Sequence, residues 1–231
     1  MASINQLVSD IAHTLRQPNN EPLRRSIKSA IITTRNELIR RSYENHGYID
    51  RAFMQRFKVT LIDVLDGDPI NVDPDVYAEM AIGLTPIKRT EQLVPRPVRL
   101  TNNLPFARVS SAGFSSNREI PFIKETSARF RSAVPGLCGM PAYDYINGYI
   151  YLFPAKGKTL DLGAIVIEGP FEHPNEIDLA NAVTDEWSVM FDDNEYLLSE
   201  DMVGQIKEIL YKRDILQTVR ETNEIPNNIK V

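Results

Sequence analysis

The sequence predicts an α+β fold, in which helices from the N- and C-terminal segments form a bundle and a proline-rich β-sandwich or barrel-like insert lies between them. Two observations predict it. Apolar residues recur at helical spacing near both ends of the 231-residue chain. Eleven of the fifteen prolines fall between residues 66 and 170, a density that excludes long helices there. We therefore expect bundle helices in 1–65, the β-rich insert in 66–170, and further helices with a partner-binding tail in 171–231.

Two helices are predicted before residue 48. The first begins after Ser3, a good N-cap residue, because apolar residues from Ile4 to Leu15 recur on one helical face. Two prolines within 17–22 end it. The second covers 23–43 and ends at Asn45-His46-Gly47. Residues 49–65 are expected to continue as helix and then to become a strand at 58–62, where β-branched residues are frequent.

The insert is predicted to hold many short strands, since proline turns separate its apolar runs. The clearest element is a hairpin over 143–153, where Asn147-Gly148 supplies the positive φ angles of a type I′ turn between two aromatic strands. Further short strands are expected at 94–100, 107–111 and 163–168.

A long helix is predicted from Ser199 to about Glu221, because acidic residues occupy its first turn and apolar residues recur to Val219. The polar tail that follows contains Ile225, Pro226 and Ile229. Two interpretations of this tail are equally consistent with its sequence: a flexible arm that becomes ordered when it binds a partner, or a frayed terminus.

Charge is distributed unevenly along the chain. Residues 1–60 hold ten basic and five acidic residues (+5), residues 61–167 hold eleven of each (0), and residues 168–231 hold five and fifteen (−10). Such opposite ends suit head-to-tail contacts between copies, although a solvated acidic surface is an equal alternative. The chain has neither an apolar run long enough for a membrane span nor a secretory signal, and its single Cys138 cannot form an internal disulfide. Assembly in a reducing cytoplasm fits these features.

The sequence contains no recognisable catalytic or metal-binding motif. Its three histidines and Cys138 are far apart, and Gly157-Lys158 lacks the upstream glycine of a phosphate-binding loop. Acid pairs such as Asp66/Asp68 have turn composition. We therefore expect no cofactor, no metal and no catalytic residue.

Two groups of residues are candidate contact sites. The basic residues of helix 24–41 could follow a phosphate backbone, but pairing with the acidic C-terminal segment of the same or a neighbouring copy is favoured. The hairpin tyrosines suit packing or subunit contact better than ligand binding. The candidate subunit and partner contacts are Arg24, Arg25, Arg40, Arg41, Tyr145, Tyr149, Tyr151, Ile225 and Ile229.

The order of these parts carries a resemblance. An N-terminal helical pair, a proline-rich insert with the aromatic hairpin 143–153, and the acidic stretch 194–203 leading into a long helix resemble the head-to-tail connector proteins of short-tailed phages. More narrowly, the chain is similar to the ring or adaptor proteins of crAss-like phages, although its β insert is larger than that of short adaptors. The resemblance implies a non-enzymatic virion protein, about twelve copies of which form a ring beneath the portal protein. It also implies contact with other neck or tail proteins and a central channel that passes double-stranded DNA.

Two functions of other classes remain as alternatives. One is a metal-dependent phage-associated nuclease that uses Asp66, Asp68 and Glu168. The other is an accessory protein that contacts DNA through the basic helix 24–41.

Overall fold

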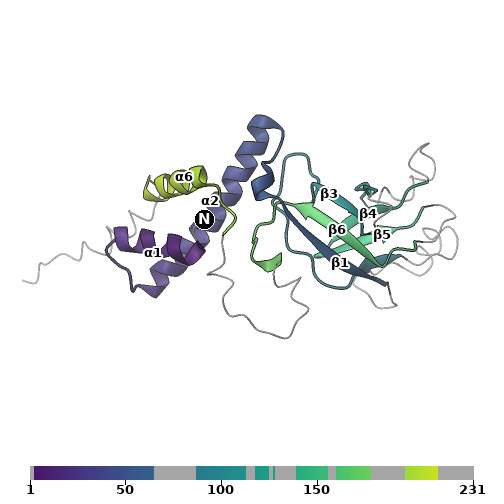
Figure 1. Ribbon diagram of the computed structural model, residues 1–231, viewed down its shortest axis with the longest axis horizontal. Coiled ribbons are helices and arrows are strands. Elements are labelled where there is room, and N and C mark those ends of the chain that lie inside the picture. Colours follow the sequence, from purple (N-terminus) through teal and green to yellow (C-terminus); the bar gives the residue numbers. More distant parts are fainter. Residues whose placement is uncertain are drawn as a thin grey trace, which may run out of the picture. The chain divides into compact units, whose positions relative to one another are not determined.

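The computed structural model describes residues 3–64, 87–112, 118–124, 127, 139–155, 160–177 and 196–212. The chain forms two compact units, which are treated separately below (Figure 1). The helical unit consists of Met1–Phe53 and Glu186–Val231, and the sheet unit consists of Met54–Asp185. The mixed α+β class is confirmed. In the described part of the chain, no helix has the length and apolarity needed to cross a membrane.

Local capping sets the bounds of the first two helices. Helix α1 (Ile4–Thr14) begins with a capping box, in which the Ser3 hydroxyl accepts the amide of Gln6 and the Gln6 side chain accepts the amide of Ser3. Helix α2 (Glu21–His46) begins at Asn20, whose side chain accepts the amide of Leu23. It ends at Gly47, which has a φ of 73° and donates its amide to Tyr43. The N-cap Ser3 and the end of the second helix at 45–47 were predicted, whereas the Asn20 cap was not, and the second helix begins two residues before its predicted start at 23.

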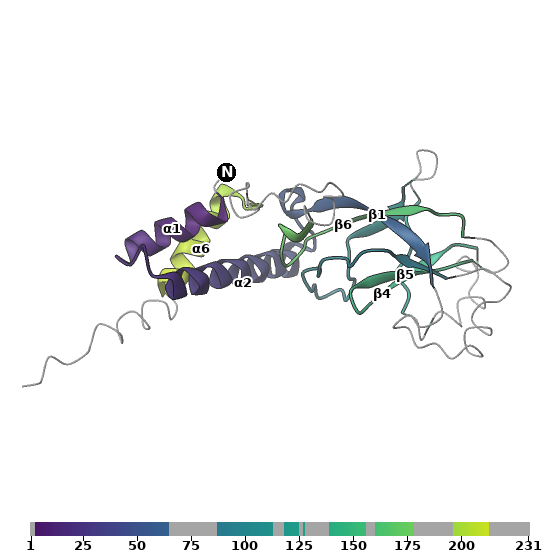
Figure 2. The same cartoon turned by 90° about the horizontal axis from the view of Figure 1, so that it is seen from below.

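Helix α6 (Glu200–Lys212) completes the described part of the helical unit. It begins directly after Ser199, whose carbonyl accepts the amides of Met202 and Val203. Helix α2 contacts both α1 and α6, which lie beside it (Figure 2). Each of the three helices buries an apolar stripe, and the buried residues include Ile4, Leu7, Val8, Ile11, Ile27, Ile31, Ile39, Met202, Ile206 and Leu210.

The sheet unit holds a single curled antiparallel sheet with the strand order β3-β6-β1-β2-β5-β4. Its strands are β1 (Gln55–Asp63), β2 (Lys88–Thr90), β3 (Arg108–Ser111), β4 (Ala142–Ile146), β5 (Tyr149–Phe153) and β6 (Ala164–Gly169). Strand β1 joins two halves of this sheet. Its first part pairs with β6, from Gln55 opposite Gly169 onward, and its last part also pairs with β2, where Leu61 lies opposite Thr90.

The core of the sheet unit lies on one face of the curled sheet. Alternate residues of β1, namely Phe57, Val59 and Leu61, point into it, as the period of two along a strand requires. Aromatic side chains fill much of the space, and the rings of Phe57 and Phe171 meet edge to face at 5.4 Å. Further core residues are Phe106, Val109, Ile120, Tyr143, Ile150, Leu152, Ile165, Ile167 and Ile177.

Both edges of the sheet are bonded to one short segment, 118–123. Its first half meets β3, where the amide of Ile120 donates to Val109 and that of Ser111 donates to Arg118. Its second half meets β4, where Tyr143 donates to Pro121 and Ile123 donates to Tyr143. On β4, the amide of Tyr145 donates to the carboxylate of its neighbour Asp144 at 2.8 Å. The sheet therefore has an almost closed, barrel-like hydrogen-bond network.

Several strand predictions are confirmed and one is wrong. The hairpin is present as β4 and β5, with positive φ at both Asn147 (53°) and Gly148 (87°), and strands occur at 108–111 and 164–169. The predicted strand 94–100 is not a regular strand but an extended segment with one isolated bridge, Pro97 to Phe171. Pro95 and Pro97 have no amide proton, so a regular ladder cannot form there.

The connection after α2 also differs in detail. The expected helix after residue 49 is a single 3₁₀ turn, Arg51–Phe53, and the strand begins at Gln55, three residues before the predicted start. The predicted end of the last helix and the tail 222–231 lie outside the described residues.

Candidate functional site

The four arginines predicted as contacts on α2 have different surroundings. The half-buried Arg24 donates to the carbonyl of Pro18 and to the hydroxyl of Ser9, both at 3.2 Å. Arg24 therefore links α2 to the preceding turn and to α1. Since these contacts are internal, Arg24 serves the fold of the helical unit.

The other three arginines are at the surface. Arg25, Arg40 and Arg41 are exposed. Arg41 forms an ion pair with Glu37 at 2.6 Å, one helical turn away. Such exposed pairs contribute little to stability, so the guanidinium of Arg41 can exchange its partner for one on another molecule at low cost.

Arg35 is one of the basic residues of helix 24–41 that were expected to pair with an acidic segment or with phosphate, and its side chain is completely buried. Its Nε donates to the carbonyl of Leu197 at 3.1 Å, its Nη1 donates to the Asn36 side chain, and its guanidinium lies 5.7 Å from the centre of the Tyr196 ring. Burial lowers the pKa of Arg35 and raises that of Tyr196. The sequence contained a pattern that predicts this burial. Arg35 lies at a spacing of four in one row with the apolar residues Ile27, Ile31 and Ile39, and so on the same face of the helix.

The three predicted tyrosines occupy three kinds of site. Tyr151 is completely buried, so its side chain does not lie on a contact surface. This is a correction that follows from the sheet, in which Tyr151 joins Ile87 and Phe153 in a small core on the opposite face. Tyr149 is partly exposed, and the guanidinium of Arg89 lies 4.7 Å from the centre of its ring. Tyr145 is half-buried and donates its hydroxyl to the carbonyl of Val94 at 3.2 Å.

Tyr145 lies in the wall of an open groove of about 1250 Å³ in the sheet unit. One side of the groove is the segment 92–105, which includes three prolines, and the other includes the hairpin turn 147–148. Backbone hydrogen bonds fix the segment, since Val94 donates to Gly148, Val98 donates to Pro170, and Glu172 donates to Arg96. The groove is therefore a built feature of the fold.

The groove combines exposed apolar and charged side chains. Leu93 and Leu104 in its lining are 61% and 41% exposed, which is unusual for leucine. The charged residues in the lining are Arg96, Arg99, Lys124, Glu172 and Glu176. Apolar area ringed by polar residues is typical of protein interaction sites. The sequence reading missed this site, although the run of prolines beside Leu93 and Arg96 indicated an extended surface segment.

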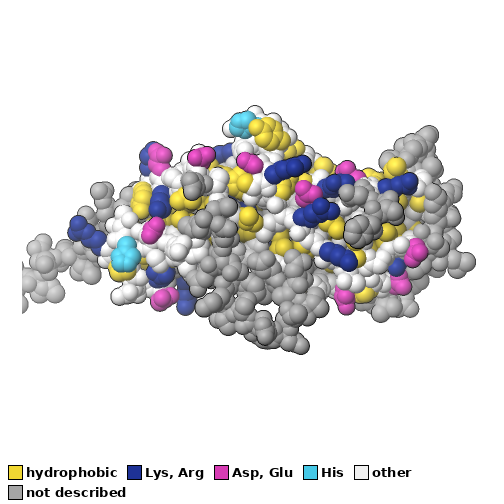
Figure 3. All heavy atoms as spheres, viewed as in Figure 1, with side chains coloured by type: hydrophobic (Ala, Val, Ile, Leu, Met, Phe, Trp, Pro, Cys, Tyr) yellow, Lys and Arg dark blue, Asp and Glu magenta, His cyan; other side chains and the backbone are white. Residues whose placement is uncertain are grey.

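A second charged feature lies on the outer face of the sheet. Arg56 of β1 and Arg108 of β3 flank Glu168 of β6 in the registered row across three strands, and Lys58 follows on β1. Figure 3 shows Lys and Arg side chains over this part of the sheet. Glu168 thus lies between two arginines, which is an arrangement for cross-strand ion pairing.

No group of three or more His, Cys, Asp or Glu residues suited to a metal ion occurs among the described residues. Asp66, Asp68 and Cys138 lie outside them, as do Ile225 and Ile229. Among the described residues, Glu168 lies opposite Arg56 and Arg108 and not beside other carboxylates. The features that the described residues do form are the exposed arginines of α2 and the groove of the sheet unit.

Comparison with known families finds a match over nearly the whole chain. The family model described as phage tail ring protein 2, CrAss_Ring_2, matches residues 6–230. No curated protein matches the chain significantly. The match spans both compact units, including the groove and the buried Arg35, and the chain therefore belongs to the phage tail ring protein 2 family of crAss-like phages.

Proposed function

We propose that this ring protein of the phage tail works in the head-to-tail connector, where about twelve copies form a ring that binds the portal protein and other neck or tail proteins. The ring is assembled in the host cytoplasm and works in the virion without catalysis. Double-stranded DNA passes through its channel without sequence-specific contacts. The family match over 6–230 is the observation that carries this proposal.

The surfaces of the two units support a ring of identical copies. A ring needs a head-to-tail contact, in which each copy presents two different and complementary patches. The helical unit exposes Arg25, Arg40 and Arg41 on α2, whereas the sheet unit exposes Leu93 and Leu104 in its groove. These are two different patches, and the acidic surplus of residues 168–231, with a net charge of −10, supplies a complement for the arginines.

The charge distribution supports passage of DNA. Residues 168–231 carry a net charge of −10, and the whole chain carries −5. A channel wall with an acidic surplus repels phosphate, so that DNA slides without being held. The basic helix is a poor DNA-binding surface by comparison, because Arg24 and Arg35 are used inside the helical unit.

Light scattering coupled to size exclusion tests the proposal. The purified protein is measured alone and mixed with the portal ring of the same phage. We expect a complex whose mass corresponds to about twelve copies on the portal. A protein that stays monomeric at high concentration and ignores the portal overturns the proposal.

A pair of variants tests the arginine contact within the same experiment. Arg40→Glu reverses a charge on the exposed face of α2, and Lys58→Glu makes the same change on the sheet. We expect Arg40→Glu to raise the protein concentration needed for assembly about fivefold, and Lys58→Glu to change it less than twofold. Equal effects of the two variants would show that α2 has no special part in the contact.

A further inference from the structure

The groove of the sheet unit has the shape and chemistry of a site for an extended peptide. The segment 92–105 lines it, and the partly exposed Pro97 and Pro105 add apolar rings without amide donors. Leu93 and Leu104 add exposed aliphatic surface. Phe122 and Tyr145 add aromatic surface. A peptide with two or three apolar side chains at intervals of a few residues would cover this surface.

The charges of the groove are of both signs. Arg96, Arg99 and Lys124 supply positive charge, and Glu172 and Glu176 supply negative charge. Arg96, Lys124 and Glu176 are exposed. An occupant of the groove should therefore carry both acidic and basic residues beside its apolar ones.

One segment of this chain has that pattern. Residues 221–231 read Glu-Thr-Asn-Glu-Ile-Pro-Asn-Asn-Ile-Lys-Val. Glu221 and Glu224 precede the apolar residues Ile225, Pro226 and Ile229, and Lys230 follows them. The segment therefore combines acidic, apolar and basic residues, which are complementary to the cationic, apolar and anionic groups that line the groove.

From these observations we infer that residues 221–231 of one copy dock in the groove of a neighbouring copy and link the subunits of the ring. The inference rests on the proposed function, because it needs a neighbour. The tail follows α6 in the helical unit, whereas the groove belongs to the sheet unit. Each copy thus carries a donor on one unit and an acceptor on the other, which is the requirement for a head-to-tail ring.

The length of the chain after α6 is sufficient. Residues 213–231 follow the last described residue of that helix. At about 3.3 Å per residue, they span up to roughly 60 Å when extended. That reach exceeds the width of a domain of this size, so a tail can extend to the next subunit.

Crosslinking between two differently substituted proteins tests the inference. Cys138 is first replaced by Ser, so that introduced thiols are the only ones. One protein then carries Leu104→Cys in the groove and the other carries Ile225→Cys in the tail. The two are mixed and treated with a short bismaleimide, and the same sample is sized by light scattering.

We expect a covalent dimer that forms at least about tenfold faster than in a control mixture, in which Lys58→Cys on the outer face of the sheet replaces the groove cysteine. A ring that forms without the dimer overturns the inference and leaves the proposed function standing. A crosslink found only inside a chain that carries both cysteines also overturns it, because the tail then occupies its own groove. A sample that stays monomeric with and without the portal ring, and forms no dimer, overturns both.

A charge exchange gives a second measurement that needs no cysteine. Arg96→Glu in the groove and Glu224→Arg in the tail should each raise the concentration needed for assembly about fivefold. The double variant should restore it to within about twofold of the parent, because the pair is re-formed with opposite signs. If the double variant assembles as poorly as the product of the single effects predicts, the two side chains do not meet and the inference is wrong.

Discussion

Arg35 and Tyr196 form a completely buried contact, in which the guanidinium lies 5.7 Å from the centre of the aromatic ring. The two residues are 161 positions apart in the sequence, on α2 and just before α6. Nε of Arg35 also donates to the carbonyl of Leu197. The Arg35 side chain therefore fixes the segment that precedes α6 to helix α2. The contact joins the N- and C-terminal segments of the helical unit.

Replacement of this arginine should destabilise the helical unit. We expect Arg35→Ala to lower the free energy of unfolding by about 2–4 kcal/mol, because it leaves a cavity and removes the donor to a carbonyl. Arg35→Lys should lose most of the same energy, because an ammonium group cannot reproduce the planar fork. Urea unfolding measures both variants, with Arg25→Ala on the exposed side of α2 as the matched control within about 0.5 kcal/mol. Equal effects of Arg35→Ala and Arg25→Ala would contradict the buried contact.

Gly148 should not tolerate a side chain. Its φ is 87°, and an added Cβ would lie 2.8 Å from Cδ2 of Leu93. We expect Gly148→Ala to cost about 1–2 kcal/mol of stability, because the positive φ strains any residue with a Cβ, whereas the exposed Leu93 side chain can move aside. Gly163→Ala, at a glycine with open space around its Cβ position, is the control. Thermal unfolding of the two variants should differ by several degrees, and the reverse order would contradict the turn geometry.

Alkaline pH should destabilise the sheet unit through Tyr143. Burial raises the pKa of Tyr143 above its ordinary value of 10.0, and the negative charges of Glu119 and Asp144 raise it further. The folded state therefore keeps the proton more tightly than the unfolded state. The contribution of Tyr143 to the free energy of unfolding is fully present below about pH 10. It is lost as the pH rises toward the pKa of the folded state, by up to about 1.4 kcal/mol per pH unit.

Tyr143→Phe removes the ionisable group and should reduce that loss. Urea unfolding at several values between about pH 9 and 11 measures it, with Tyr48→Phe at a 66% exposed position as the control. A Tyr143→Phe variant that loses stability as steeply as the parent would refute the role of this hydroxyl.

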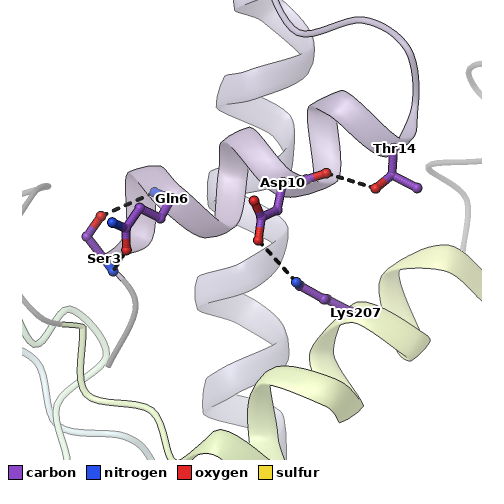
Figure 4. A network of polar contacts seen from close by, with 5 residues as sticks. All are labelled: Ser3, Gln6, Asp10, Thr14 and Lys207. Atoms are coloured by element: carbon purple, nitrogen blue, oxygen red, sulfur yellow. Dashed lines mark hydrogen bonds and ion pairs between the residues drawn. The ribbon is translucent and has the colours of Figure 1, made fainter.

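The ion pair between α1 and α6 should contribute little. Nζ of Lys207 lies 3.2 Å from Oδ2 of Asp10 (Figure 4), but the two side chains are 33% and 64% exposed. A double-mutant cycle with Asp10→Ala and Lys207→Ala should give a coupling energy of about 0.2–1 kcal/mol, falling in about 0.5 M salt. A coupling above about 2 kcal/mol that resists salt would mean that the pair is a principal link between these helices.

Elements with local causes were predictable from the sequence. Ser3 and Gln6 form the cap of α1, Gly47 ends α2, and Asn147-Gly148 turns the hairpin, each through contacts within a few residues. The pairing of β1 with β6 was not predictable in the same way, since Gln55 lies opposite Gly169 across more than a hundred residues. Neither partner carries a local signal for the other.

Candidate contact residues were predictable in type but not in position. Arg24, Arg25 and Arg40 are similar in the sequence, and only the packing of α1 against α2 shows that Arg24 is bonded internally. Tyr145 and Tyr151 lie on opposite faces of the hairpin, since Tyr145 pairs with Ile150 and Tyr151 with Asp144. The alternation does not show that Tyr151 lies in a small core and Tyr145 in the wall of the groove. The groove itself depends on hydrogen bonds from 94–98 to distant turns, which no window of the sequence contains.

The hydrogen bonds of segment 118–123 to β3 and β4 also affect how the protein behaves before it assembles. In a concentrated solution, proteins with unpaired strand edges tend to associate through those edges and precipitate. Here the Tyr145 amide is already capped by Asp144, and both outer strands already hold main-chain partners. Neighbouring chains therefore do not pair through their strand edges. Their association depends on contacts between side chains, which can select a specific partner and limit the number of copies that join.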